Sequence, residues 1–218
     1  MNRDASRPAA AVLISGSGTN LQAFIDAAQA DQLGFNLQVV LSNNPEAAGL
    51  ERARKADIGI ECINHRDYPV REEYDAALVT ALDQHDPDLI ILAGFMRILT
   101  PVFIDHYAGK VLNIHPSLLP KYPGLDTHQR AIDAGDKWHG STVHFVTAEL
   151  DGGPRIIQGR VPILSDDTAA TLAARVLTIE HQIYPQAATL FAERRLACRD
   201  GHAWLDGQRL DEPIAQAE

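Results

Sequence analysis

Cysteine is scarce in this sequence, and the two that occur, Cys62 and Cys198, lie far apart and form no CxxC pair. The spacing therefore suggests neither a disulfide framework nor a cysteine-based metal site. Long apolar runs are also missing: none approaches the ~20 residues needed to cross a bilayer. The first ten residues, MNRDASRPAA, hold no apolar core of a secretion signal. We expect an unprocessed cytoplasmic protein without a membrane partner.

Basic residues are also fewer than acidic ones. The 19 Lys and Arg residues are outnumbered by 29 Asp and Glu residues, which gives a formal net charge of -10. Nucleic acid is therefore not expected as a partner, since its phosphates are bound chiefly by Lys and Arg. A small anionic substrate must instead be held locally, by backbone amides at a helix N-terminus and by one or two cations.

Short apolar runs alternate with helical patterns along the chain. This order predicts an α/β fold with a doubly wound, mostly parallel sheet flanked by helices. Expected strands are 10–15, 37–42, 58–63, 88–94, 110–115, 141–146 and 155–163. Expected helices are about 19–30, 46–56, 70–85, 101–107, 127–135 and 168–194. We expect one domain over 1–218, with a core of about 10–195, a meander at 196–210 and a tail at 211–218.

Local signals mark two of these boundaries. Asn44 is placed to cap the second helix, with Pro45 at its first position. The pairs Asp200-Gly201 and Asp206-Gly207 are spaced to turn a short antiparallel meander. The final stretch, EPIAQAE, is expected to fray.

The glycine-rich stretch SGSGTN (15–20) joins a buried strand to a helix, so its amides can cradle a phosphate. A dinucleotide fingerprint would need a glycine where Leu21 stands, and the lysine of a nucleotide-triphosphate loop is absent. The pattern therefore favours a phosphomonoester. A tight turn without a ligand is the alternative.

Asn113 and His115 lie two apart at the end of an expected strand, so their side chains share one face. In acyl transfer to an amine, a histidine can move protons and an asparagine amide can stabilise the oxyanion. Asp151, in the turn-forming LDGGP, could favour the imidazolium form of such a histidine. Each motif also has an ordinary structural explanation, as a cap, a loop residue or an Asp turn.

The segment AGFMRILTP could form an apolar wall for a flat ring, or could be a buried strand end that runs into a short helix. Arg71 and His65 are surface candidates for binding an anionic tail, although exposed charges are usually only solvated.

Six segments, in this order, resemble the phosphoribosylglycinamide formyltransferases of purine biosynthesis: ISGSGTNLQA, SNNPEAAGLERA, LAGFMRIL, LNIHPSLLPKYPGLDTH, HGSTVHFV and ELDGGPRI. The similarity runs from about residue 11 to residue 210. It implies a Rossmann-like formyltransferase fold and a one-carbon group transferase. The reaction implied is transfer of formyl from 10-formyltetrahydrofolate to the amine of glycinamide ribonucleotide, without a metal, by a monomer or a homodimer.

The resemblance also implies roles for single residues. Asn113, His115 and Asp151 match the catalytic asparagine, histidine and aspartate. The ribonucleotide-binding positions match Gly18, Thr19, Asn20 and Glu180. The folate-binding positions match Arg71, Met96, Arg97, Ile98, Leu99, Thr147, Ala148, Glu149 and Leu150.

Related classes fit less well. Methionyl-tRNA formyltransferases share NxHPSLLP but usually continue differently and add a tRNA-binding domain, whereas this chain continues with YPGLDTH. A formyltransferase or hydrolase for another acceptor, and a non-catalytic phosphate-binding module, remain open. Asp126, Ala148 and Arg155 depart from the family pattern, in segments that we expect to be loops beside the site.

Overall fold

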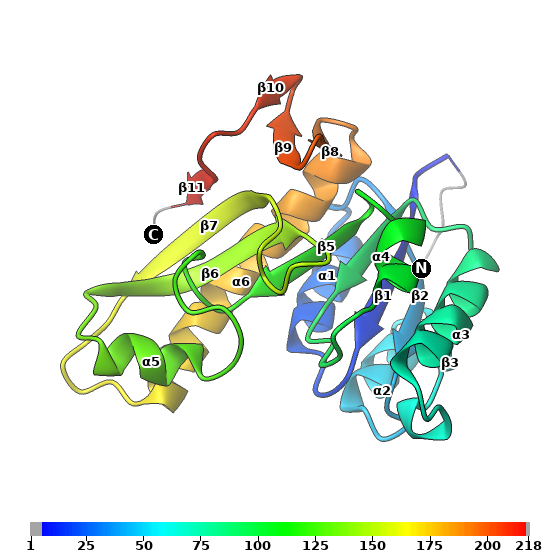
Figure 1. Cartoon of the computed structure of the whole chain (residues 1–218), viewed down its shortest axis with the longest axis horizontal. Coiled ribbons are helices and arrows are strands. Elements are labelled where there is room, and N and C mark those ends of the chain that lie inside the picture. Colours follow the sequence, from blue (N-terminus) through cyan, green and yellow to red (C-terminus); the bar gives the residue numbers. More distant parts are fainter. Residues whose placement is uncertain (1–5, 217–218) are drawn as a thin grey trace.

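The computed structural model describes residues 6–216 and contains an eight-stranded sheet (Figure 1). Its strand order is β11-β7-β6-β5-β4-β1-β2-β3. The bounds along the chain are β1 (Ala9–Ile14), β2 (Asn36–Ser42), β3 (Gly59–Cys62), β4 (Leu89–Leu92), β5 (Val111–His115), β6 (Trp138–Phe145), β7 (Arg155–Pro162) and β11 (Ile214–Gln216). The pairs from β3 across to β5 are parallel, and β6 runs antiparallel to both β5 and β7. The expected mostly parallel sheet is confirmed.

Helices cover both faces of this sheet. They are α1 (Thr19–Gln29), α2 (Ala48–Lys55), α3 (Arg71–Asp83), α4 (Pro101–His106), α5 (Thr127–Asp133) and α6 (Ala169–Ala192), with a 3-10 turn η1 (His65–Asp67). Alternate residues of β1 face opposite sides. Val12 packs with Phe24 of α1 and Tyr184 of α6, whereas Leu13 packs with residues of α3 and α4. The doubly wound arrangement follows from this alternation, because every second side chain of a strand points to the same face.

The second helix begins later than expected. Asn44 does not cap it: the Asn44 Oδ1 accepts a hydrogen bond from the nearby Glu46 N at 3.1 Å, which forms a local turn. The helix α2 begins at Ala48, with Ala47 as its N-cap, so Pro45 lies outside it. The local turn accounts for an Asn-Pro pair that resembles a helix start.

The C-terminal segment agrees with the sequence in part. A separate sheet contains β8 (Leu196–Arg199), β9 (His202–Leu205) and β10 (Gln208–Arg209), and all of its pairings are antiparallel. Both Asp-Gly pairs have positive φ at each residue, which is the backbone of a tight hairpin turn. The expectation of a frayed end was wrong for Ile214–Gln216, which pairs in parallel with β7; residues 217 and 218 lie outside the described residues.

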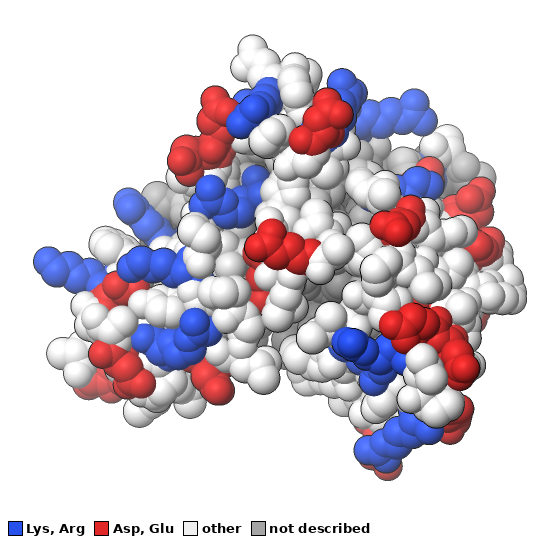
Figure 2. All heavy atoms as spheres, viewed as in Figure 1, with Lys and Arg blue, Asp and Glu red and all other residues white. Residues whose placement is uncertain are grey.

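The surface shows no dominant charge on the face seen in Figure 2, where basic and acidic side chains are interspersed. None of the helices among residues 6–216 combines the length and the apolar character of a membrane-spanning helix.

Candidate active site

Polar residues gather where neighbouring parallel strands end. The segment after β1 and the segment after β4 are joined directly: Met96 N donates to Ser15 Oγ at 2.7 Å, and Ser15 N donates to Gly94 O at 3.2 Å. In open parallel sheets, ligands bind beyond these carboxyl ends. The fold thus brings the glycine-rich loop and the 93–99 segment to one edge.

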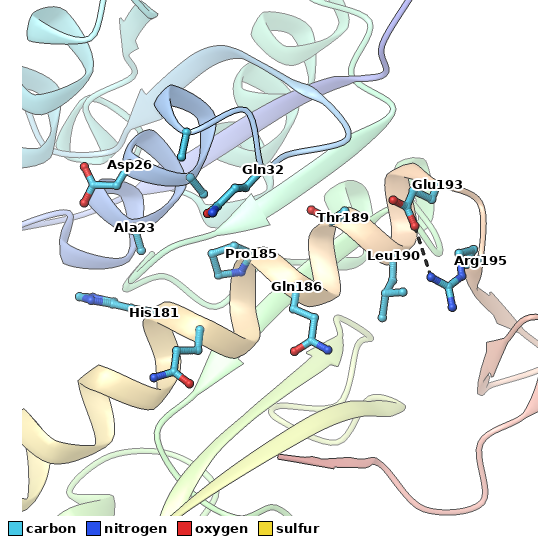
Figure 3. Close-up of a pocket in the computed structure, with 13 residues that line it drawn as sticks. Ala23, Asp26, Gln32, His181, Pro185, Gln186, Thr189, Leu190, Glu193 and Arg195 are labelled. Atoms are coloured by element: carbon cyan, nitrogen blue, oxygen red, sulfur yellow. Dashed lines mark hydrogen bonds and ion pairs between the residues drawn. The ribbon is translucent and has the colours of Figure 1, made fainter. Parts of the chain in front are cut away.

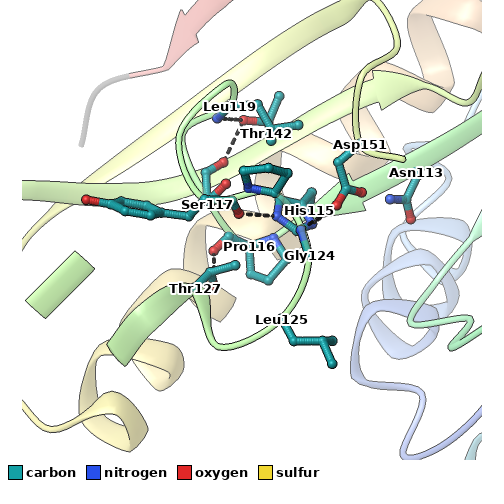
Figure 4. Close-up of polar contacts among 12 residues, drawn as sticks. Asn113, His115, Pro116, Ser117, Leu119, Gly124, Leu125, Thr127, Thr142 and Asp151 are labelled. Atoms are coloured by element: carbon teal, nitrogen blue, oxygen red, sulfur yellow. Dashed lines mark hydrogen bonds and ion pairs between the residues drawn. The ribbon is translucent and has the colours of Figure 1, made fainter. Parts of the chain in front are cut away.

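His115 and Asp151 lie side by side at this edge (Figure 4), and both side chains are more than nine-tenths buried. The His115 Nε2 lies 2.9 Å from Tyr122 O, and since a carbonyl can only accept, this nitrogen carries a proton. His115 Nδ1 faces Asp151 Oδ2 at 3.4 Å. That separation is longer than a charge-assisted hydrogen bond, so His115 and Asp151 are close but do not form a tight hydrogen bond.

Asn113 is oriented by His144, a residue that the sequence reasoning did not single out. The His144 Nδ1 lies 2.9 Å from Phe145 O and must donate to it, and burial lowers the pKa of this imidazole. The neutral His144 Nε2 can then accept from Asn113 Nδ2 at 3.1 Å. This contact fixes which way the Asn113 amide points. Antiparallel pairing places the two residues directly opposite each other. The sequence alone does not give this register, so it could not reveal the contact.

The glycine-rich loop ends at Gly18, which is the N-cap of α1 in a left-handed conformation with φ of 69°. A Cβ at Gly18 would lie 2.7 Å from Gly49 Cα, so α2 packs closely against the loop. The side chain of Arg52 also fixes the loop, because its Nε donates to Ser17 O at 2.8 Å. The N-terminus of α1 is therefore held in a form that presents backbone amides.

Glu180 joins this loop to β6. Its Oε2 accepts from Asn20 Nδ2 at 2.8 Å, and its Oε1 lies 3.1 Å from Ser141 Oγ. The Ser141 hydroxyl donates to His115 O at 2.7 Å, so it cannot also donate to Glu180. A protonated Glu180 completes the chain by donating to Ser141, in agreement with a pKa that burial raises. The buried Asn20 Oδ1 has no hydrogen-bond partner, which leaves an acceptor for a ligand.

The residues expected to contact folate include several exposed apolar side chains. Met96 is 73 % exposed, Ile98 57 % and Leu150 55 %, an unusual density for large apolar residues. Arg97 is held differently, with its guanidinium 4.8 Å from the centre of the buried Tyr74 ring. Leu99 packs against the hydrophobic cluster that contains Tyr74. This segment offers an apolar surface beside a fixed cation.

Other expected folate contacts are less tightly built. Arg71 is the exposed first residue of α3, and nothing described ties it to the 96–99 segment, so its role stays a prediction. Thr147, Ala148 and Glu149 lie before Asp151 in the loop between β6 and β7, where the Thr147 hydroxyl contacts Glu149 O at 3.5 Å.

Two of the three departures from the family pattern lie at element boundaries, and the third lies in a loop as expected. Asp126 is the N-cap of α5, in a left-handed conformation, and Ala148 is an exposed loop residue. Arg155 is the first residue of β7 and not a loop residue. Its Nη1 donates to Leu119 O at 2.9 Å, so it supports the loop after β5.

A groove of about 860 Å³ lies between α1 and α6 (Figure 3). It is lined by residues such as Asp26, His181 and Gln186, and it includes none of the expected site residues. Among residues 6–216 no group of three His, Cys, Asp or Glu side chains is arranged to hold a metal ion.

A sheet of this topology, with an Asn, His and Asp set at its carboxyl edge, is that of a formyl transferase. The family model described as formyl transferase matches residues 9–188, and the chain belongs to this family. The chain is 53 % identical over 199 residues to the phosphoribosylglycinamide formyltransferase of Escherichia coli strain K12, covering 91 % of this chain and 94 % of that protein. It is 45 % identical over 182 residues to the human trifunctional purine biosynthetic protein adenosine-3, a match that covers 84 % of this chain and 18 % of the human protein.

Solved structures agree with the sequence comparison. The phosphoribosylglycinamide formyltransferase of Coxiella burnetii superposes with a TM-score of 0.91 at 46 % identity, covering 96 % of this chain and 99 % of that one. The glycinamide ribonucleotide transformylase 1 of Symbiobacterium toebii gives a TM-score of 0.89 at 43 % identity, with coverage of 93 % and 95 %.

Proposed function

We propose that this protein transfers the formyl group of 10-formyltetrahydrofolate to the amine of phosphoribosylglycinamide, in the synthesis of purines. The observation that carries the proposal is the meeting of His115, Asp151 and the oriented Asn113 at one edge of the sheet. A helix N-terminus that can take a phosphate and an exposed apolar segment that can take a ring both lie at this edge, after the neighbouring strands β1 and β4.

The reaction follows from this arrangement. The substrate amine attacks the formyl carbon and forms a new C–N bond, and the carbonyl oxygen becomes an oxyanion. The free hydrogen of the Asn113 amide and the imidazolium of His115 stabilise this charge. The bond from the formyl carbon to N10 of the folate then breaks, N10 takes a proton, and the proton lost by the amine balances it.

Asp151 supports the histidine in this scheme. Its carboxylate faces His115 Nδ1 and also accepts from Gly124 N at 2.9 Å, so it is held in place from the loop. A carboxylate at this position can accept a proton or a hydrogen bond from His115 Nδ1. We propose that His115 and Asp151 together pass protons between the amine, water and N10.

The two substrates bind at different parts of this edge. In this proposal the ribonucleotide phosphate takes the backbone of Gly18, Thr19 and Asn20, while Glu180 contacts the glycinamide end. The folate ring lies against the segment from Met96 to Leu99 and the loop from Thr147 to Leu150, with Arg71 near its anionic tail. We also propose that the protein works in the cytoplasm. The chain forms one folding unit in this proposal, because Leu196 and Ala203 of the meander pack into the main core.

The test is a spectrophotometric assay with 10-formyl folate, run with and without glycinamide ribonucleotide. The proposal predicts folate product only when the ribonucleotide is present. Product in its absence would indicate a hydrolase, and no product with either mixture would indicate another acceptor or a binding module.

A thermal shift measurement separates these last two cases. A folate analogue and the ribonucleotide should each raise the melting temperature, because each binds the folded state alone. Stabilisation by the folate analogue but not by the ribonucleotide would indicate a different acceptor. Stabilisation by the ribonucleotide alone would indicate a phosphate-binding module.

A further inference from the structure

The loop between β5 and α5, residues 116–126, touches both members of the His115–Asp151 pair through its backbone. The Tyr122 carbonyl accepts from His115 Nε2 at 2.9 Å, and Gly124 N donates to Asp151 Oδ2 at 2.9 Å. The loop therefore influences which nitrogen of the neutral histidine carries the proton, and so whether the Nδ1 that faces Asp151 is protonated. Any shift of Tyr122 would remove the partner of Nε2.

Two residues of this loop have a backbone conformation that is unusual for residues other than glycine. Tyr122 has φ of 57° and Asp126 also has φ of 57°, both in the left-handed region that side chains disfavour. Such a residue is strained, and it persists only where surrounding contacts fix it. The contacts that fix Tyr122 are therefore relevant to catalysis.

Asp136 supplies the fixing contact from outside the loop. Its Oδ2 accepts from the Tyr122 hydroxyl at 2.8 Å, and both of its oxygens lie within 2.9 Å of Lys121 Nζ. Asp136 directly follows the turn that ends α5, and its own N donates to Ala131 O. The hydrogen bonds from Lys121 and then Tyr122 lower the pKa of Asp136, so it is an acceptor at neutral pH.

Arg130 of α5 adds a second attachment. Its Nη1 donates to Pro123 O at 2.6 Å and lies 3.2 Å from Leu125 O, on either side of Gly124. Its guanidinium also stacks 5.2 Å from the centre of the Tyr122 ring. The helix α5 therefore holds the loop on both sides of the two backbone groups that meet the catalytic pair.

We propose that Tyr122 and Asp136 are positioning residues for the reaction: the bond from the Tyr122 hydroxyl to Asp136 holds the Tyr122 carbonyl against His115 Nε2. This inference rests on the proposed role of His115 in proton transfer. Neither residue touches the reacting atoms. They act through the tautomer of His115 and through the position of the loop.

The environment of His115 must be kept constant in any test. Titratable side chains that interact with it electrostatically include Asp151, His128, His139 and His144. Burial, followed by the charge on His128, lowers the pKa of His139 to about 4. Measurements at one neutral pH therefore compare variants in which these histidines keep the same charge.

Four variants test the proposal. Tyr122→Phe removes the hydroxyl alone, and Asp136→Ala removes its acceptor. Asp136→Asn keeps an oxygen that can accept from Tyr122 and is the conservative rescue. Lys121→Ala is the matched control, because it removes an exposed ion pair of little expected value and leaves the bond between Tyr122 and Asp136 in place.

The readouts are the ¹⁵N shifts of the His115 ring, which report its tautomer without substrate, and kcat and KM with both substrates. Tyr122→Phe and Asp136→Ala should reduce the population protonated at Nε2 and lower kcat about 10- to 100-fold, with KM within about twofold. Asp136→Asn and Lys121→Ala should stay within about threefold of the parent protein.

An unchanged tautomer and kcat in Tyr122→Phe would overturn the proposal, as would a loss of melting temperature in that variant without any change at His115. If Asp136→Ala does not fold, Tyr122→Phe still decides the matter. Failure of the proposed function is a separate outcome: the parent protein would show no turnover, while the ring shifts would still report whether the loop sets the tautomer.

Discussion

The two halves of the candidate site are built in different ways. On the proposed ribonucleotide side the candidate binding groups are backbone amides, fixed by glycines and by the close packing of α2 on the loop before α1. On the proposed catalytic side the groups are side chains, and each is oriented by a further hydrogen bond, such as that from Asn113 to His144. Substrate binding in the first half should therefore be sensitive to side chains added at the glycines. Activity in the second half should be sensitive to the chemical identity of each side chain.

The largest expected effect tests the catalytic half. Asn113→Ala should lower kcat by roughly 100- to 1000-fold, about 3–4 kcal/mol, with little change in substrate binding, because the amide acts on the oxyanion of the transition state. Steady-state kinetics with both substrates measure this. A change confined to KM would contradict the assigned role. Asn64→Ala, which removes an asparagine that caps η1, is the matched control and should leave kcat within about threefold of the parent protein.

The backbone half is tested by a pair of glycines in one loop. Gly18→Ala places a Cβ 2.7 Å from Gly49 Cα at a residue with φ of 69°, so it should cost about 1–3 kcal/mol of unfolding free energy and raise KM for the ribonucleotide. A Cβ at Gly16 would meet no heavy atom within 4 Å beyond its chain neighbours, so Gly16→Ala should change stability by less than about 0.5 kcal/mol. Chemical denaturation and kinetics check both variants. Equal effects of the two substitutions would show that packing against α2 does not shape the loop.

A smaller effect is expected at Glu180, where the two halves meet. Burial raises the pKa of this carboxyl in the folded protein, so the unfolded chain ionises first as the pH rises. Below the ordinary glutamate pKa of 4.5 both states are protonated and the residue has no linked effect; above it, the stability of the parent protein falls as the pH rises toward the folded pKa.

Glu180→Gln keeps both hydrogen bonds and removes this cost. It should therefore raise the unfolding free energy at neutral pH and leave it unchanged at low pH, while it weakens ribonucleotide binding. Melting temperatures across the pH range, with and without the ribonucleotide, provide the measurement. A variant that is less stable than the parent at neutral pH would contradict the raised pKa.

Periodicity in the sequence was enough to predict most of the fold. The buried runs over β1, β4 and β5 and the helical patterns of α1, α3 and α6 lie within a few residues of their expected bounds. The start of α2 was missed because Asn44 forms a local turn. The strand β11 was missed because a pairing of three residues with β7 leaves no pattern of its own in the sequence.

The site could be predicted only in part, for a similar reason. Asn113 and His115 share a strand, so their spacing was enough to place them together. The contacts of Asp151 with His115, of His144 with Asn113 and of Asp136 with Tyr122 span 14 to 36 residues, and they depend on register and loop path. Sequence spacing carries no information on such contacts.

The most direct test of the central claim follows the formyl carbon itself. With ¹³C-labelled 10-formyltetrahydrofolate and glycinamide ribonucleotide, NMR should show the label moving to the amine nitrogen of the ribonucleotide, one label for each folate product. Release of the label as free formate would contradict direct transfer and would assign the Asn113, His115 and Asp151 site to hydrolysis instead.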